Sequence, residues 1–263
     1  GKEEEGGGGG KGKKAKDKEI VLAEVEAVYL TGQRFTTFNA SVLWRLENVR
    51  HLDLSKNKLK EVGGSVESLV NLEVLNLSLN MLTSLPEGLE KLQKLQRLFV
   101  FQNKLINLPD RIGDLISMRE LQAHSNDLIS IPPDVKRLKN LCKLGLRNNF
   151  LMTLPDEFAH LDNLRSLDLS ENKICALPDE VQRLSKLEVL LLSKNSLISF
   201  PSGVRGLVSL RKLDVRGNPL LRVFPPSMLL LPLLKDLRID SVLESDPTVK
   251  SLARSKAMCI VTA

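Results

Sequence analysis

Apolar and polar residues alternate along this chain in short segments of the form L-x-L, and these segments recur at a fixed spacing. Each is followed by an asparagine, and eight such asparagines are 23 residues apart. A leucine stands five residues before every one of them, and a leucine or isoleucine stands two residues after it. Eight matches in one register identify an internal repeat. The repeat asparagines are Asn57, Asn80, Asn103, Asn126, Asn149, Asn172, Asn195 and Asn218.

The repeat predicts one structural coil for every period. Alternation at period two predicts a short β-strand with one face inward, and the strands of successive coils should stack into a parallel sheet. An asparagine side chain both donates and accepts, so a stacked column of them can satisfy backbone groups where the chain turns inward. A proline follows six of the asparagines and predicts an extended return, closed by a turn or two of helix such as 87–92. The expected fold is an α/β solenoid, a curved horseshoe with a parallel sheet on its concave side.

Departures from the repeat mark the two ends of the solenoid. Residues 28–51 fit a degenerate first repeat, in which Gln33 replaces the asparagine and the spacing is one residue too long. Eight clear repeats occupy residues 52–236, and residues 237–241 form a partial last coil. Because terminal repeats cap the core, they are commonly atypical. We therefore expect one domain over residues 19–247, followed by a cap helix and tail over residues 248–263.

Residues 1–18 consist almost entirely of glycine, lysine and glutamate. Such a segment cannot bury enough apolar surface to offset the entropy of ordering it, so we expect a disordered tail. Gly7, Gly12 and Lys13 match part of a phosphate-loop motif, but Lys14 stands where a serine or threonine should bind magnesium. We therefore expect no nucleotide site in the tail.

Charge and cysteine content narrow the functional classes. The net charge of +6 is concentrated near the two ends of the chain, which leaves the repeats almost neutral. Nucleic-acid-binding surfaces need a concentrated basic face, so this class is disfavoured. Cys142, Cys175 and Cys259 follow no disulfide pattern, which favours a reducing compartment and a cytoplasmic location. No apolar run is long enough to span a membrane.

The motif LxxLxLxxNxLxxLP over residues 28–241 resembles that of the small cytosolic leucine-rich-repeat proteins. The same repeat type is found in Ras-suppressor, Scribble-type polarity and plant intracellular Ras-group proteins. The resemblance implies a protein-interaction role, often in signalling. It implies no catalytic residues, because the family shares none, and it does not name a partner, because the residues that define the repeat are the buried ones.

The repeat register also predicts which side chains face out from the concave sheet. They stand six, four and two residues before each asparagine. Only 4% of the residues are aromatic, yet two phenylalanines occupy this face in one coil. Exposed aromatic residues flanked by basic ones are typical of interface hot spots. An alternative is that the phenylalanines fill the floor of the curved sheet. The expected partner-binding residues are Arg97, Phe99, Phe101, Gln122, His124, Lys143 and Arg147.

His51, Asp53 and Ser55 superficially match a hydrolytic triad. They alternate on one strand, where neighbours on the same face are about 6.6 Å apart. A nucleophile and its base must be within about 2.6–3.2 Å, so we expect no catalysis here. His124 has no cysteine or carboxylate at metal-ligand spacing, and we expect neither a metal nor a cofactor.

The sequence therefore predicts a non-catalytic signalling adaptor or scaffold that acts as a monomer and binds another protein. One alternative is a subunit of a cytoskeletal or ciliary assembly, and another is a regulatory subunit in a phosphatase or GTPase pathway. A third is contact of the lysine-rich tail with a nucleic acid or an acidic membrane, which depends on residues 1–18 alone.

Overall fold

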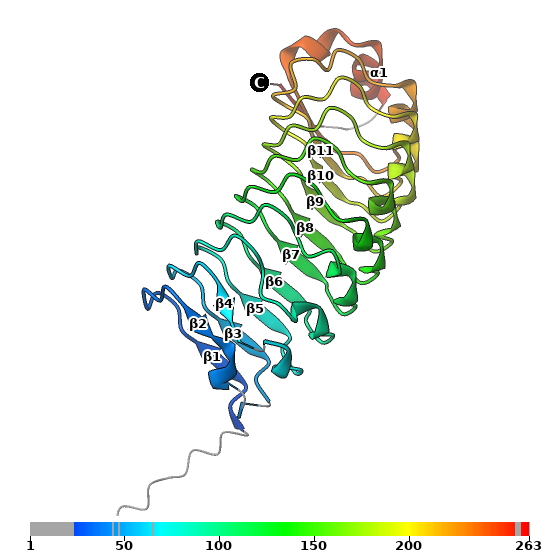
Figure 1. Cartoon of the computed structure of the whole chain (residues 1–263). Helices are drawn as coiled ribbons and strands as arrows, with labels where there is room; N and C mark the ends of the chain where they lie inside the picture. The colour runs from blue at the N-terminus through cyan, green and yellow to red at the C-terminus, as the bar shows by residue number, and fades with distance from the viewer. Residues whose placement is uncertain (1–23, 44, 47, 65, 256–258, 263) are drawn as a thin grey trace, which may run out of the picture.

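The computed structural model describes residues 24–43, 45–46, 48–64, 66–255 and 259–262. They form a curved solenoid, in which the strands lie side by side from the N-terminal to the C-terminal end (Figure 1). The tail expected over residues 1–18 and the first residues of the expected domain, 19–23, lie outside the described residues. The curvature and stacking confirm the expected horseshoe architecture.

The concave side is one parallel sheet of 11 strands, with a pair of shorter strands beside its N-terminal end. Neighbouring strands pair with their central residues aligned, as Leu75 aligns with Leu98 and Leu98 with Leu121. The sheet runs in the order β1 (Ala27–Tyr29), β3 (His51–Asp53), β5 (Val74–Asn76), β6 (Arg97–Phe99), β7 (Glu120–Gln122), β8 (Lys143–Gly145), β9 (Ser166–Asp168), β10 (Val189–Leu191), β11 (Lys212–Asp214), β12 (Asp236–Ile239) and β13 (Cys259–Thr262), and the separate pair is β2 (Phe38–Asn39) and β4 (Val62–Gly63).

Short 3-10 helices close the coils on the convex side, where the sequence predicts a turn or two of helix. A proline residue precedes or begins five of them, from η6 to η10, as Pro155 does for η7. The helices are η2 (Ala40–Leu43), η3 (Val66–Ser68), η4 (Leu89–Lys91), η5 (Ile112–Asp114), η6 (Pro133–Arg137), η7 (Asp156–His160), η8 (Asp179–Arg183), η9 (Ser202–Gly206), η10 (Pro226–Leu230), η11 (Ser241–Ser245) and the α-helix α1 (Pro247–Ser255).

The core is a continuous aliphatic column between the sheet and the 3-10 helices. Leu98 of β6, the following Val100 and Leu105 of the next segment are all fully buried. Phe158 of η7 is one of the few aromatic side chains inside, at 2% exposure. Because each coil buries its apolar side chains mainly against its two neighbours, the fold is stabilised by contacts between adjacent repeats.

The repeat asparagines form a ladder of hydrogen bonds through the core. Asn149 donates from Nδ2 to the carbonyl oxygens of Ala123, at 3.1 Å, and Leu146, at 2.9 Å. Its Oδ1 accepts from the backbone N–H of Leu128 at 3.0 Å. Asn57 at the N-terminal end bonds in the same way to Leu30 and Leu54. Each asparagine therefore ties its own turn to the preceding coil.

The residue immediately before each repeat asparagine has a left-handed backbone. In the first seven coils this residue is not glycine, and its φ lies between 53° at Gln102 and 56° at positions such as Leu79. Only the last coil places a glycine here, Gly217, with φ 73°. A left-handed backbone costs a residue with a Cβ roughly 1–2 kcal/mol, so the hydrogen bonds of the following asparagine must hold the turn.

The C-terminal end differs from the expected cap and tail. Helix α1 begins one residue before the expected boundary, and Asp246 caps it by accepting from the N–H of Val249 at 3.0 Å. The segment expected as a tail contains β13, which extends the sheet by pairing with β12. The solenoid thus continues one coil past the partial coil expected to end at residue 241. In the preceding coil, that of β12, Val242 stands at the position of the repeat asparagine, so the sequence register is lost before this strand.

Gly206 lies where η9 packs against the backbone of η8. A Cβ at this position would lie 2.1 Å from the carbonyl oxygen of Gln182, whereas at Gly63 the nearest atom would be 3.9 Å away. We therefore expect Gly206→Ala to lower the free energy of unfolding by about 1–2 kcal/mol, as overpacking a tight site does. Urea denaturation, with Gly63→Ala as the matched control, measures the difference. Equal stabilities of the two variants would contradict the close packing of η8 and η9.

Candidate functional site

The residues expected to bind a partner lie together on the concave face, on β6, β7, β8 and the turns that follow them. Strand pairing places Phe99 beside Gln122 and Gln122 beside Gly145. Phe99 and Phe101 are both half-buried, so they are less exposed than the sequence predicts. Equivalent positions on parallel strands are only about 4.8 Å apart, and neighbouring side chains therefore cover part of each ring.

Phe101 and His124 form a nearly parallel aromatic stack on this face. Their rings stack with centroids 4.5 Å apart and planes only 11° from parallel. Neither residue belongs to a strand, since each follows the end of its own strand by two residues. The stack presents a flat, amphipathic surface, and Nδ1 of His124 at its edge lies 3.4 Å from the hydroxyl oxygen of Ser125. Surfaces of this kind carry much of the binding energy at protein interfaces.

A hollow of about 400 Å³ adjoins the stack on the side of the following coils. Gly145 forms part of its floor, and a Cβ there would lie 2.0 Å from Oε1 of Gln122. In the neighbouring coils the same strand position holds Gln122 and Asp168, so the missing side chain opens the hollow. The lining residues are Gln122, His124, Ser125, Gly145, Arg147, Asn148, Asp168 and Glu171.

Ion pairs hold several of the charged side chains in place. Lys143 lies 2.9 Å from Glu120, and Arg147 lies 3.0 Å from Glu171. Lys194 reaches the same carboxylate at 2.9 Å. Hydrogen bonds from Lys194 and then Arg147 lower the pKa of Glu171, so this carboxylate is ionised at neutral pH. The walls of the hollow are therefore polar, and ion pairs between neighbouring coils hold their side chains in place.

His124 is neutral at pH 7, because burial lowers its pKa and the nearby Arg147 lowers it further, against an opposing effect of Asp168. An unfolded chain binds the proton at the ordinary pKa, so between the two values it holds more protons than the folded chain. The free energy of unfolding should therefore fall as the pH decreases through this window, below about 6.5. We expect His124→Gln to lose less stability than the wild type between pH 7.5 and pH 5.0 in urea denaturation. An equal or larger loss in the variant would assign the acid sensitivity to other groups.

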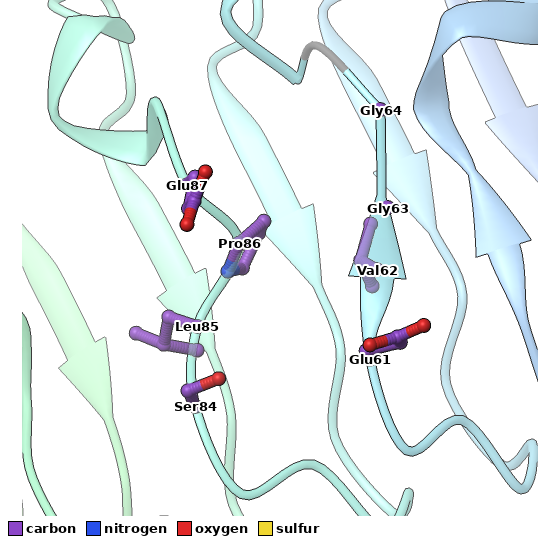
Figure 2. A pocket seen from close by; sticks show the side chains of 8 residues that line it. All are labelled: Glu61, Val62, Gly63, Gly64, Ser84, Leu85, Pro86 and Glu87. Atoms are coloured by element: carbon purple, nitrogen blue, oxygen red, sulfur yellow. The ribbon is translucent and has the colours of Figure 1, made fainter.

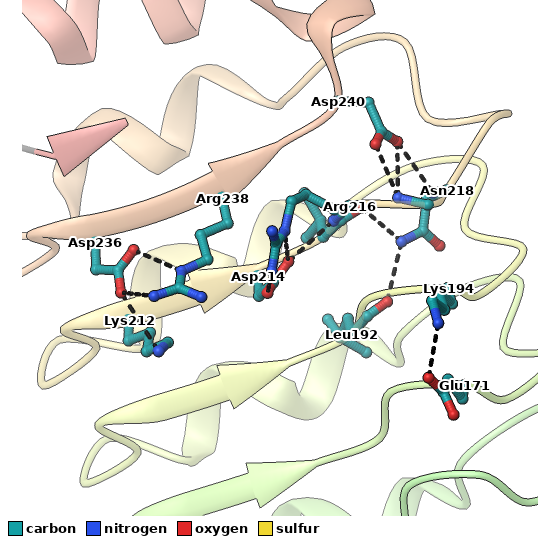
Figure 3. Close-up of polar contacts among 12 residues, drawn as sticks. Glu171, Leu192, Lys194, Lys212, Asp214, Arg216, Asn218, Asp236, Arg238 and Asp240 are labelled. Carbon is teal, nitrogen blue, oxygen red and sulfur yellow. Dashed lines mark hydrogen bonds and ion pairs between the residues drawn. The ribbon is translucent and has the colours of Figure 1, made fainter. Parts of the chain in front are cut away.

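Farther along the same face the side chains are charged and paired with one another (Figure 3). Arg216 lies 2.6 Å from the buried Asp214, and this hydrogen bond raises the pKa of the guanidinium. Asp236 is shared by Arg238, at 3.2 Å, and Lys212, at 3.5 Å. A partner would have to break these pairs to use the charges, at a cost in desolvation.

Asp240 ends the backbone ladder at the C-terminal side of this network. Its carboxylate accepts from the N–H of Gly217 at 2.9 Å and from the N–H of Asn218 at 3.2 Å (Figure 3). In earlier coils the same backbone groups donate to the next coil's carbonyls, as Leu79 does to Phe101. A side chain thus replaces the carbonyls where η11 turns away from the sheet. Asp240 is a structural residue.

A second hollow, of about 230 Å³, lies outside the concave face. It opens between Val62–Gly64 and the facing segment Ser84–Glu87 of the next coil (Figure 2). Gly63 stands where Pro86 stands one coil later, so no ring occupies the space. Two carboxylates, Glu61 and Glu87, contribute to the lining. The hollow is explained by the missing proline and holds no arrangement of catalytic groups.

Asp53 does not serve His51 as a triad carboxylate would. It accepts from the N–H of Ser55 at 2.8 Å, from Thr31 at 3.0 Å and from Asn76 at 3.0 Å. Burial would raise the pKa of Asp53, but these hydrogen bonds outweigh it and lower the pKa. His51 instead packs against Tyr29, with ring centroids 5.0 Å apart. The polar and aromatic side chains on this part of the sheet therefore form a structural network of hydrogen bonds and ring contacts.

The described part of the chain shows neither a metal cluster nor a membrane-spanning helix. Those residues contain no cluster of three or more histidine, cysteine, aspartate or glutamate side chains that could hold a metal ion. Their helices are also too short or too polar to cross a membrane. The hollow at Gly145 was not predicted, although Gly145 stands out in the sequence as a glycine in the outward strand position.

Three family models match the chain. A model described as a leucine-rich repeat region matches residues 28–144, and further leucine-rich-repeat models match residues 116–174 and 209–231. The comparison with curated protein sequences gives no significant match.

Solved structures show the same architecture. A leucine-rich-repeat protein of Leptospira interrogans is 25% identical, with a TM-score of 0.53, and the match covers 92% of this chain and 84% of that one. The ectodomain of a membrane receptor kinase from Arabidopsis thaliana, solved in complex with CASPARIAN STRIP INTEGRITY FACTOR 2, is 21% identical with a TM-score of 0.62. This match covers 86% of the present chain but only 34% of the ectodomain, so the likeness concerns the fold. With its 11-stranded parallel sheet and its matches to three repeat models, the chain belongs to the leucine-rich-repeat proteins.

Proposed function

We propose that this protein is a non-catalytic adaptor or scaffold in signalling, which binds a protein partner on its concave face around Phe99, Phe101 and His124. Leucine-rich-repeat domains are protein-interaction modules, and the three matching models support that general role. The observation that carries the proposal is the stacked Phe101–His124 pair beside a polar hollow. It combines an apolar anchor with fixed hydrogen-bonding groups, which is the arrangement of an interface centre.

The partner should place an aromatic or aliphatic side chain on the stack and a polar side chain in the hollow. Glu171 and Asp168 are acidic and Arg147 is already paired with Glu171, so a donor such as lysine, arginine or an amide suits the hollow. Arg97 is exposed at the edge of the phenylalanines and can pair with an acidic residue on the partner's rim. We also propose a cytoplasmic location, which the three free cysteines support.

Affinity capture with mass spectrometry tests this proposal. The wild type and a Phe99→Ala/Phe101→Ala variant are used as baits at equal concentration, with Leu191→Ala as a control on the same face. Proteins recovered by the wild type and the control but lost with the double variant are partners of the concave face. If the same proteins bind all three baits, this face is not the binding site. Stoichiometric recovery of cytoskeletal or ciliary subunits would favour the assembly function instead.

A further inference from the structure

A row of exposed apolar side chains crosses five consecutive coils outside the concave sheet. Each residue stands three positions after a repeat asparagine, in the segment that leaves the strand. Ile129 is 56% exposed, Met152 60% and Ile198 59%. In the two coils before the row the same position holds the polar residues Lys60 and Thr83. We call this row the lateral stripe, and it consists of Ile106, Ile129, Met152, Cys175 and Ile198.

The members of the lateral stripe are direct neighbours. Backbone hydrogen bonds join Ile129 to Ile106 at 3.2 Å and Ile198 to Cys175 at 3.1 Å. Phe150, 43% exposed, adds an aromatic ring in the coil of Met152, and the ammonium of Lys173 lies 4.8 Å from its centroid. Single exposed apolar residues are ordinary on protein surfaces, but a contiguous patch marks an interaction site.

Acidic residues accompany the stripe on its convex side. Ile106 lines a groove of about 530 Å³ together with Glu87, Glu90 and Asp110. Asp156 and Asp179 occupy the position of Asp110 in later coils and are exposed as well. Within the described residues, no ion pair to Glu87, Asp110, Asp156 or Asp179 is formed. Their negative charge is therefore available to a basic partner.

We propose that the lateral stripe is a docking site for an amphipathic helix of a partner protein, which carries one apolar row with basic residues beside it. Adjacent coils are about 4.8 Å apart, and an α-helix rises about 5.4 Å per turn, so one apolar residue per turn meets one coil. In an extended peptide the side chains on one face are about 6.6 Å apart, which differs more from the spacing of the coils than the rise of a helical turn does. The five coils span about 19 Å, which about 13 helical residues cover.

This site is separate from the concave face and does not depend on the function proposed for it. The lateral stripe and the Phe101–His124 stack are carried by different segments of the coil. Both could therefore be occupied at once, and a variant of either surface should leave the other able to bind.

A displayed library of random 16-residue peptides provides the probe. Peptides are selected on the whole protein and counter-selected on an Ile129→Glu/Met152→Glu variant, whose melting temperature is checked first. We expect enriched sequences with apolar residues at i, i+3 or i+4, and i+7, and with more basic than acidic residues. A selected peptide should bind the double variant at least tenfold more weakly than the wild type. Val70→Glu, which changes another exposed apolar residue, and Phe101→Ala should leave its affinity unchanged.

A second variant tests the charge argument without touching the apolar residues. We expect the affinity for the selected basic peptide to fall at least tenfold in the triple variant Asp110→Lys/Asp156→Lys/Asp179→Lys. Enrichment of acidic or strictly alternating sequences, or of no sequence that distinguishes wild type from variant, would overturn the proposal. So would a wild-type dimer in sedimentation velocity that the Ile129→Glu/Met152→Glu variant abolishes, because the stripe would then bind a second copy of this chain.

Discussion

Replacing Asn149 with alanine is expected to lower the free energy of unfolding by roughly 3 kcal/mol or more. The substitution removes three donated hydrogen bonds and one accepted one, all made to backbone groups. The carbonyls of Ala123 and Leu146 and the N–H of Leu128 then lose this partner. Each buried polar group left unsatisfied costs about 1–3 kcal/mol. Urea denaturation followed by circular dichroism measures the change.

The control for Asn149 is Asn107→Ala. Asn107 is exposed on a loop of the same solenoid, so its loss should change the free energy of unfolding by less than about 0.5 kcal/mol. A change of the same size in both variants would mean that the asparagine ladder does not stabilise the fold. We expect Asn149→Ala to lower the free energy of unfolding and to leave the concave face intact. Any loss of binding by this variant should disappear at low temperature.

The effect should also depend on position in the ladder. Asn149 has complete coils on both sides, whereas Asn57 connects only to the degenerate first coil, through Leu30 and Phe35. In a solenoid each coil is stabilised by its two neighbours, so a break in the centre separates two halves that must each remain folded. A break near the end releases only a terminal coil.

Much of the fold could be predicted because its period is visible in the buried positions. Leu98, Leu121 and Leu144 align in adjacent strands as the 23-residue register requires. The left-handed turn before each asparagine could not be predicted from its own residue, since Leu79 and Lys194 have no preference for that backbone. The neighbouring hydrogen bonds impose it. Strand β13 could not be predicted because the preceding coil has Val242 at the position of the asparagine that marks the register.

The candidate site was predictable only in part. The register shows that Phe99 and Phe101 belong to the outward columns, but burial of their rings depends on neighbours in adjacent coils. The stack of Phe101 on His124 joins residues of two coils, and their rotamers decide it. The hollow likewise depends on the absence of a side chain at Gly145 and on the conformation of the Gln122 side chain, which lies over this glycine. The lateral stripe was visible in the sequence as one apolar column, but its exposure became clear only when the buried columns beside it were placed.

Replacing Phe101 with alanine is expected to separate binding from folding. Because the ring is half-buried and stacks only on one side of His124, its loss should lower the free energy of unfolding by less than about 1 kcal/mol. Affinity for the partner recovered by capture should fall by about 2 kcal/mol or more, which is roughly 30-fold. Isothermal titration calorimetry measures the affinity, and thermal denaturation measures the stability of the same sample.

The matched control for Phe101 is Leu191→Ala, which removes an apolar side chain from the same face in β10, away from the stack. It should cost as little stability and leave the affinity within about threefold of the wild type, because interface energy is concentrated in a few central residues. A Phe101→Ala variant that loses several kcal/mol of stability would instead place the ring in the core of the sheet. If Phe101→Ala changes neither the affinity nor the stability, the binding site does not lie on this face. The lateral stripe would then be the next surface to test.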